Sequence, residues 1–382
     1  MFLPISAANL HIRLGVHFHY ICGMTQQQKT VLVAPLDWGL GHATRCIPVI
    51  EQLQEHGFKV IIGGSGTGLQ LLKKRFPHLD LIELPSYRIT YPTNGSMLLH
   101  MLLKTPSLLR AIQKEKKLLP SILREYGISH VLSDNRYGLH HQNAHCVFMT
   151  HQVHIRSGTR FPFADRLLFW LQRRFLNQFN RVWIVDEPAE SGGVLAGRLS
   201  SSEGLTIPHH YIGILSRFPI KSDAAITSEM HYDRLALLSG PEPQRTILEE
   251  KIFRHFKTLP GRSLIVKGVH GNTVTHINDV TFFDGITDSQ MTGVLSHNPV
   301  FYARPGYSTL MDLARLQHGK VVFIPTPGQT EQEYLGKVYE EKYGFTCIQQ
   351  ASSFPAEDSV KTGLWPPLQD AEILKKIISQ LC

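Results

Sequence analysis

Two histidines and one aspartate follow short apolar runs of the sequence, and their side chains could move a proton. His42 comes after a glycine turn that contains Gly39 and Gly41, whereas Asp134 and His151 each follow a later run. Imidazole titrates near neutral pH, so His42 could accept a proton from an incoming hydroxyl, or it could only cap a helix. Asp134 could be the base, could orient His42, or could belong to an ordinary turn. These residues are candidates for general-base catalysis.

The second half of the chain contains a segment suited to phosphate. Within residues 301–312 a strand-like run leads into a turn at Gly306, after which Ser308 and Thr309 can cap a new helix. The unpaired N–H groups of a helix N-terminus bind diphosphates well. Asp312 lies one turn further on the same face, where a carboxylate can hold two ribose hydroxyls or can simply stabilise the helix start.

A loop rich in amides follows the next apolar run. Residues 325–334 contain Gln329 and Gln332, whose side chains suit the hydroxyl groups of a sugar. A dinucleotide site is disfavoured, because Thr44 stands where the G-x-G-x-x-G pattern needs its third glycine. Five histidines at positions 140–154 suggest a metal, but an apolar run splits them and no firm carboxylate or thiolate completes the set. We therefore expect neither a dinucleotide cofactor nor a metal.

The elements that position these residues form repeated βα units. Short β-branched runs alternate with amphipathic stretches, which is typical of a mostly parallel sheet. We expect a helix over 46–56 and strands at 31–34, 59–62, 79–84, 129–132, 146–149, 182–185, 235–238, 263–266, 280–283, 299–302 and 320–324. The loops at the carboxyl ends of parallel strands share one edge of a sheet, so the candidate residues are expected to face one cleft.

The length of 382 residues exceeds that of a usual single core, which favours two domains. We predict an α/β fold with two doubly wound domains, residues 24–218 and 230–382, joined by a polar linker at 219–229. Residues 1–23 lack the basic start of a signal peptide and are expected to form a flexible extension.

Composition excludes several classes of protein. The chain is 42% hydrophobic and 18% charged, which argues against a disordered or fibrous protein, and no apolar run approaches the roughly 18 residues of a membrane helix. The net charge of +8 suits anionic partners such as phosphates or acidic lipids. The five cysteines are odd in number and scattered, which indicates a reducing, cytoplasmic compartment.

One basic stretch has two interpretations. Residues 97–119 combine leucines near helical spacing with Lys114, Lys116 and Lys117, among other basic residues. The stretch could be an ordinary helix packed on the first domain with its lysines in water. It could instead rest on an anionic membrane, which would make the protein peripheral to the inner face of the plasma membrane.

Four segments, taken in order, resemble glycosyltransferase family 28. They are residues 39–42 (Gly-Leu-Gly-His), 239–245, 304–312 and 328–332. The resemblance spans residues 31–345, and the best-known member of that family adds N-acetylglucosamine to the lipid-linked peptidoglycan precursor. It implies the GT-B fold, in which two Rossmann-like domains face a cleft, the first binding the acceptor and the second the nucleotide sugar.

The resemblance also implies roles for particular residues. On the donor side these are Arg245 at the diphosphate, Phe283 beside the base, Gly306, Ser308 and Thr309 at the phosphate-binding helix start with Arg304 before them, Asp312 on the ribose, and Gln329 and Gln332 on the sugar. On the acceptor side these are Gly39, Gly41 and His151. The family usually has Glu in place of Asp312, and its glycine-rich loop is here Gly-Pro-Glu-Pro at 240–243.

These features together predict an inverting glycosyltransferase. A hydroxyl of a carbohydrate or lipid-linked acceptor, deprotonated by His42 or Asp134, would attack the anomeric carbon of a nucleotide diphosphate sugar, with uridine implied by the resemblance. We expect no cofactor, no metal and no nucleic-acid partner. Two alternatives stay open: an epimerase of the same fold, which needs no acceptor, and a non-catalytic binder of sugar nucleotides.

Overall fold

The structure is a computed structural model that describes residues 28–87, 97–158, 161–218, 230–240, 242–269, 271, 273–369 and 372–381. The predicted extension at 1–23 and the predicted linker at 219–229 lie outside the described residues.

The first half of the chain forms a seven-stranded sheet in the order β3-β2-β1-β4-β5-β6-β9, and all of its neighbouring strands are parallel. Its strands are β1 (Thr30–Pro35), β2 (Lys59–Gly64), β3 (Asp80–Glu83), β4 (His130–Asp134), β5 (His145–Thr150), β6 (Arg181–Ile184) and β9 (His209–Tyr211). Its helices are α1 (Gly41–Glu55), α2 (Gly66–Arg75), α3 (Met97–Tyr126) and α4 (Pro162–Leu176). A small hairpin, β7 (Pro188–Ala189) with β8 (Gly192–Gly193), and a short 3-10 turn at Arg198–Ser200 follow β6.

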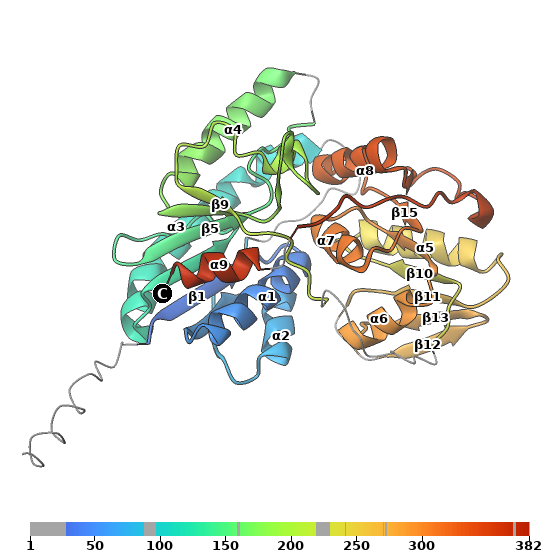
Figure 1. Ribbon diagram of the computed structural model, residues 1–382, viewed down its shortest axis with the longest axis horizontal. Helices are drawn as coiled ribbons and strands as arrows, with labels where there is room; N and C mark the ends of the chain where they lie inside the picture. The colour runs from blue at the N-terminus through green and yellow to red at the C-terminus, as the bar shows by residue number, and fades with distance from the viewer. Residues whose placement is uncertain are drawn as a thin grey trace, which may run out of the picture.

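The second half forms another seven-stranded sheet, in the order β12-β13-β11-β10-β14-β15-β16, in which only the edge strand β12 runs antiparallel. Its strands are β10 (Arg234–Leu237), β11 (Ser263–Val266), β12 (Val274–Ile277), β13 (Val280–Phe283), β14 (Val300–Ala303), β15 (Val321–Phe323) and β16 (Thr346–Cys347). Its helices are α5 (Gln244–Phe256), α6 (Asp288–Leu295), α7 (Tyr307–Leu316) and α8 (Thr330–Tyr343), with a 3-10 turn at Glu357–Ser359. The predicted α/β fold with two parallel-sheet domains is confirmed (Figure 1).

Each predicted strand overlaps an observed one, and three strands of the two sheets were not predicted. Strand β9 has three residues and β16 has two, which is too short for a periodic pattern to show. Strand β12 is an edge strand whose side chains are all exposed, so it lacks the buried apolar run that marks a strand in sequence. The unpredicted strands are therefore peripheral and short.

Two predicted helix starts are corrected. Helix α1 begins at Gly41, before the predicted start at residue 46. Helix α7 is capped by Gly306, whose extended backbone precedes the first turn, and no side chain bonds to that cap. Ser308 and Thr309 therefore lie inside the first turn of α7 and do not cap it as predicted.

The basic stretch at 97–119 lies within helix α3. Ile112 and Leu119 are buried in the first domain, while Lys114 and Lys117 are exposed. The described residues therefore match an amphipathic helix packed on the domain, and a contact with a membrane stays a prediction. No helix in the described ranges is long and apolar enough to cross a bilayer.

The chain ends on the first domain. Helix α9 (Ile373–Ser379) packs against α1 (Figure 1), and the backbone carbonyl of Leu381 accepts a hydrogen bond of 2.7 Å from Nζ of Lys29. Leu374 and Ile378 of α9 are buried in the apolar core that α1 shares. The structure thus differs from the predicted domain of 230–382 at its last helix.

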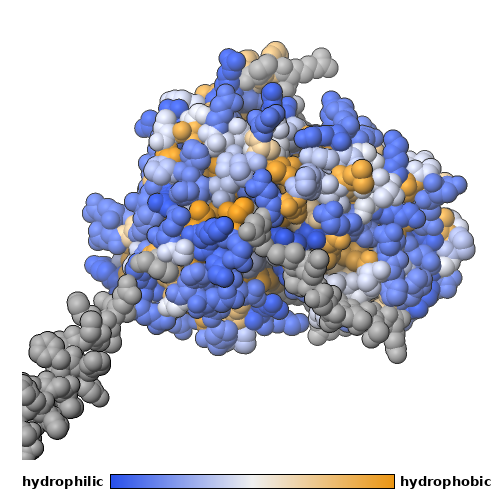
Figure 2. Space-filling model, in the orientation of Figure 1, coloured by the Kyte–Doolittle hydropathy of each residue, from blue (hydrophilic) through white to orange (hydrophobic). Residues whose placement is uncertain are grey.

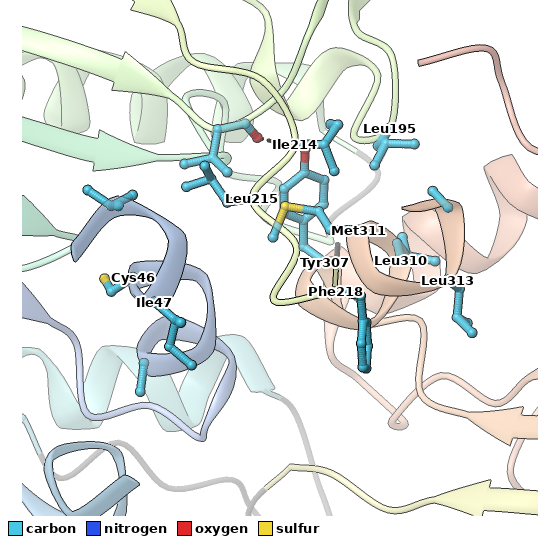
Figure 3. Close-up of a cluster of buried hydrophobic side chains, with 14 of the residues drawn as sticks. Cys46, Ile47, Leu195, Ile214, Leu215, Phe218, Tyr307, Leu310, Met311 and Leu313 are labelled. Carbon is cyan, nitrogen blue, oxygen red and sulfur yellow. Dashed lines mark hydrogen bonds between the residues drawn. The ribbon is translucent and has the colours of Figure 1, made fainter. Parts of the chain in front are cut away.

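An apolar core runs without a break from one domain to the other. Figure 3 shows Ile47 of α1, Leu215 of the segment that leaves the first domain, and Tyr307 and Met311 of α7 around one buried cluster. The Tyr307 hydroxyl donates to the carbonyl of Val185 at 2.6 Å, which ties α7 to the end of β6. Burial of this kind favours one close arrangement of the two domains.

A buried ion pair fixes the loop after β4. Arg136 and Glu115 of α3 are fully buried, and Nε of Arg136 lies 2.7 Å from Oε1 of Glu115. The other carboxylate oxygen accepts hydrogen bonds from the Tyr87 hydroxyl at 2.7 Å and from the backbone N–H of Gly138 at 3.1 Å. The pair holds the loop that follows Asp134 against α3.

We expect Glu115→Ala to lower the free energy of unfolding by about 3–5 kcal/mol, because it leaves the buried guanidinium of Arg136 without its carboxylate. Urea denaturation followed by circular dichroism measures the change. Glu125→Ala, at an exposed position of the same helix, is the control, and we expect it to change stability by less than about 0.5 kcal/mol. Equal denaturation curves for the two variants would contradict a stabilising role for the pair.

Candidate active site

The carboxyl edge of the first sheet brings three predicted residues together. Asp134 is the last residue of β4 and lies between Pro35 of β1 and Met149 of β5 in the sheet register. His42 lies in the first turn of α1, which follows β1, and His151 comes directly after β5. Adjacent parallel strands end at the same edge, so the loops that carry these side chains converge as predicted.

Asp134 is fully buried and is the centre of the cluster. Its Oδ2 lies 3.0 Å from Nδ1 of His42 and accepts a hydrogen bond of 2.8 Å from Nε of Arg45. Its Oδ1 accepts from Nη2 of Arg45, so the guanidinium grips the carboxylate with two nitrogens. Such bidentate pairs combine strength with a fixed geometry.

His42 has one nitrogen inside the cluster. Its Nδ1 can donate to Asp134 or can accept from Nη2 of Arg45 at 2.8 Å, but not both at once. When Asp134 accepts, the lone pair of the imidazole is on Nε2, which has no hydrogen-bond partner within the described ranges. Of the roles predicted for Asp134, this geometry favours orienting His42. In this tautomer Nε2 of His42 is unprotonated, as a general base requires.

The charges around the pair determine which groups are ionised. Burial lowers the pKa of His42 and the positive charge of Arg45 lowers it further, and together they outweigh the opposing effect of Asp134. Burial alone would raise the pKa of Asp134, but Arg45 and His42 bring it down to about 2. At neutral pH the cluster therefore contains a neutral imidazole beside an ionised carboxylate.

His151 connects the cluster to the second domain. Its Nδ1 accepts from Nη1 of Arg45 at 2.8 Å, so its Nε2 carries the proton and donates to Oε1 of Glu331 at 2.9 Å. The ring stacks on Tyr307 of α7 with centroids 4.2 Å apart and planes 3° from parallel. Burial would raise the pKa of Glu331, but His151 and Arg45 lower it, so Glu331 is ionised.

Sequence reasoning missed Arg45, Tyr307 and Glu331. Arg45 interrupts the buried face of α1 one turn after His42, and an arginine among buried apolar positions is a detectable signal. Tyr307 and Glu331 lie inside segments that were singled out for their neighbours. Their partners come from the other domain, and sequence spacing carries no information about that pairing.

The starts of α1 and α7 meet across the domain boundary. A Cβ atom built on Gly41 would lie 2.2 Å from Oγ of Ser308, so only glycine fits at this position without a shift. Gly39 has a φ of +73°, a left-handed conformation that favours glycine and turns the chain into α1. The predicted phosphate-binding helix start therefore adjoins the segment that carries His42.

Asp312 contacts the segment that leaves the first domain. Its carboxylate accepts a hydrogen bond of 2.8 Å from Oγ of Ser216 and lies 3.3 Å from Nε of Arg217. Arg217 also lies 3.4 Å from Asp288 of α6. Burial raises the pKa of Asp312, although Arg217 opposes this effect.

Arg245 and Phe283 share the carboxyl edge of the second sheet. Phe283 ends β13 and its carbonyl accepts from the N–H of Lys267, while Nη1 of Arg245 lies 3.4 Å from the carbonyl of Lys267. Nε of Arg245 donates to Glu242 at 2.9 Å. The Arg245 side chain and the end of β13 at Phe283 therefore share the edge where ligands bind in such sheets.

Arg304 does not fit its predicted role. It is fully buried and donates to the backbone carbonyls of Ile324, Pro325 and Gln244 at 2.9–3.0 Å. These contacts tie α5 to the loop after β15. We therefore correct its assignment from donor binding to support of this edge.

Gln329 and Gln332 build the loop that was expected to bind a sugar. The side chain of Gln329 caps α8 by accepting from the backbone N–H of Gln332. The side-chain oxygen of Gln332 accepts from the N–H of Thr326 at 2.8 Å. Both side-chain oxygens therefore shape the loop next to Glu331.

The histidines considered as metal ligands are dispersed. The ring of His140 packs on Phe179, and that of His154 stacks on Phe169, away from the cluster around Asp134. Among the described residues no group of three or more His, Cys, Asp or Glu side chains is arranged to hold a metal ion.

We expect the pKa of His42 to lie below 6.5 in the native protein, as read from NMR titration of the ring signals and assigned with His42→Ala. Arg45→Gln removes a positive neighbour and should raise this pKa, whereas Asp134→Asn removes a negative neighbour and should lower it further. Arg75→Gln, which breaks a surface pair with Glu51, is the control and should leave it unchanged. Shifts of the same sign in both cluster variants would contradict the arrangement.

Comparisons with known proteins agree on the fold. No family model matches the sequence, and no curated protein matches it. Similar solved structures include spinosyn forosaminyltransferase SpnP, at 11% identity and a TM-score of 0.54 over 92% of this chain and 93% of that one. UGT89C1 of Arabidopsis thaliana, solved with UDP-L-rhamnose, is similar at 12% identity and a TM-score of 0.54 over 93% and 92%.

A UDP-glucosyltransferase from Polygonum tinctorium is similar at 13% identity and a TM-score of 0.53, over 93% of this chain and 92% of that one. At these identities the likeness concerns the fold alone, and it covers nearly the whole of each chain. The two parallel sheets and these neighbours together give the chain the GT-B fold of glycosyltransferases.

Proposed function

We propose that the protein is an inverting glycosyltransferase, which moves a sugar from a nucleotide diphosphate sugar to a hydroxyl of its acceptor. One observation carries the proposal: the His42–Asp134 pair of the first domain adjoins the N-terminus of α7 in the second, where Gly41 meets Ser308. A group that removes a proton thus lies beside a helix start suited to a leaving diphosphate.

The reaction follows from these two groups. Nε2 of His42 accepts the proton of the acceptor hydroxyl, while ionised Asp134 stabilises the imidazolium that forms. The hydroxyl oxygen bonds to the anomeric carbon as the bond from that carbon to the diphosphate oxygen breaks, which inverts the configuration. The N–H groups at Gly306, Ser308 and Thr309, with Arg245, offset the charge that develops on the nucleotide diphosphate.

His151 and Glu331 act as positioning residues in this proposal. Their hydrogen bond of 2.9 Å joins the Arg45 cluster to the first turn of α8, which follows the loop built by Gln329 and Gln332. A sugar bound at that loop would be held at a fixed position relative to His42. The bond therefore couples the sugar position to the base across the domain boundary.

The donor and acceptor are proposed by class. A uridine diphosphate sugar is favoured by the resemblance to glycosyltransferase family 28, and the acceptor is a carbohydrate or a lipid-linked sugar. A thermal-shift screen of nucleoside diphosphates tests the donor, because a true ligand raises the melting temperature by mass action. Incubation with the stabilising nucleotide sugar alone then tests the reaction, since an isomerised sugar would indicate an epimerase instead.

We expect His42→Ala to keep its affinity for the nucleotide diphosphate and to lose turnover by roughly 10²–10⁴-fold, because only proton removal is lost. Single-turnover transfer and titration calorimetry on the same preparation separate the two effects. His56→Ala, at the end of the same helix, is the control. Turnover that survives His42→Ala but disappears in Asp134→Asn would give the base role to the aspartate.

We expect Asp312→Ala to weaken binding of the nucleoside diphosphate by about 1.5–3 kcal/mol, or roughly 10- to 150-fold in Kd, through loss of a charged hydrogen bond to the ribose. Asp288→Ala, which also removes a carboxylate from Arg217, controls for disturbance of that arginine. Unchanged calorimetric affinity in Asp312→Ala would leave Asp312 only its contacts with Ser216 and Arg217.

A further inference from the structure

Large exposed apolar side chains gather on one helix of the first domain. Five of them lie on or beside α4: Phe161 is 61% exposed, Phe163 66%, Leu167 54%, Trp170 54% and Leu171 40%. Figure 2 shows apolar surface at the upper edge of the molecule, where α4 projects in Figure 1. A concentration of this kind marks an interaction site more often than isolated exposed residues do.

These side chains share one face of the helix. Phe163, Leu167, Trp170 and Leu171 are spaced by three and four residues, which places them on one side of α4. Arg166 and Arg174 are exposed on the same side, by the same spacing. We call this set the α4 face.

The acid within α4 is turned away from that face. Oδ1 of Asp165 accepts hydrogen bonds from the backbone N–H of Ser157 at 2.7 Å and from its hydroxyl at 2.6 Å. The side chains of α4 that lie on the α4 face are therefore apolar or positively charged.

The opposite side of α4 packs against the first domain, so the helix does not need its exposed side to hold it in place. Leu176 is fully buried, and Gln172 donates to the carbonyl of Gln152 at 2.7 Å. Phe169 stacks on His154 with ring centroids 4.2 Å apart. The helix is thus fixed to the domain while its apolar and basic side faces outward.

We propose that the α4 face docks on the surface of an anionic lipid membrane. A helix with aromatic and leucine side chains and arginines on one face can bury its apolar groups at the lipid boundary while the guanidinium groups contact acidic headgroups. One further basic residue lies near the end of this helix, because Nζ of Lys116 in α3 donates to Gln178, just after α4, at 2.9 Å. The net charge of +8 has the sign that such a partner requires.

The docked helix would lie next to the candidate active site. The segment from His151 to Gly158 leads toward α4, and the bonds from Ser157 to Asp165 tie it to the first turn of that helix. The carbonyl of Arg156 accepts from Oγ1 of Thr330, one residue before Glu331. If the proposed transfer is correct, an acceptor carried by lipid reaches His42 from this side; the docking itself does not depend on that function.

Sedimentation of the full-length protein with phosphatidylcholine vesicles, with and without phosphatidylglycerol, tests the docking. We expect binding to the anionic vesicles that weakens at high salt. The triple variant F163S/L167Q/W170Q should bind at least tenfold more weakly, and R166E/R174E should lose the preference for anionic vesicles. Leu364→Gln, at a residue 76% exposed in the second domain, is the matched control and should bind like the wild type.

Fluorescence places the contact on α4. Trp170 is exposed, whereas Trp38 is half-buried and Trp183 and Trp365 are buried. Lipids brominated in their acyl chains should therefore quench the native protein and should quench Trp170→Phe much less. Native protein that does not bind anionic vesicles, or a triple variant that binds as well as the wild type, would overturn the proposal. So would binding lost in K114E/K117E of α3 but kept in both α4 variants.

Light scattering tests whether the α4 face binds a second copy of this protein instead of a membrane. Dimerisation that rises with concentration and disappears in the triple variant would assign the α4 face to a second copy instead of a membrane. The nucleotide-induced thermal shift, measured in parallel, is expected to be equal in native and triple-variant protein. A failure of docking with that shift intact overturns the membrane surface alone, and an absent shift with docking intact overturns the donor site alone.

Discussion

The buried ion pair between Arg45 and Asp134 is the interaction on which the site depends. Burying two charges is costly unless the geometry is close and the remaining hydrogen-bonding groups find partners. Here the guanidinium grips the carboxylate with two nitrogens and reaches both His42 and His151. The pair joins α1 to the end of β4, so one contact fixes the helix, the strand edge and two imidazoles. Burial and the charge of Arg45 lower the pKa of His42, while Arg45 and His42 keep the pKa of Asp134 low, so that a neutral imidazole lies beside an ionised carboxylate.

The same contact extends into the second domain through His151. Its bond to Glu331 and its stacking on Tyr307 end at the first turns of α8 and α7. The absence of a side chain at Gly41 lets α7 approach α1, and the shared apolar core keeps them together. His42, the N-terminus of α7 and the loop before α8 are thus brought together by domain packing rather than by any single segment. Asp312, held by Ser216 and Arg217, joins α7 to the chain that leaves the first domain.

Much of the fold follows from local pattern, and its exceptions have physical causes. The alternation of β-branched runs and amphipathic stretches predicted most strands because buried parallel strands must be apolar. Strand β12 was not predicted, because its side chains are exposed. Arg304 was assigned to the donor from its place beside Gly306, but it is buried and bonded to backbone carbonyls. A sequence motif gives proximity along the chain, whereas the direction of a long side chain depends on what packs around it.

The sequence by itself determined that His42, Asp134 and His151 follow strands, and parallel topology then required them to meet at one edge. Only the tertiary structure decided their partners, because Arg45, Tyr307 and Glu331 are brought to them by helix packing and by the second domain. The exposure of the α4 face was likewise decided only by the tertiary structure. Helical spacing shows that residues share a side, and the sequence pointed instead to the basic stretch of α3. Whether the apolar side of a helix is buried depends on the helices and strands that pack against it, and these come together only when the chain folds.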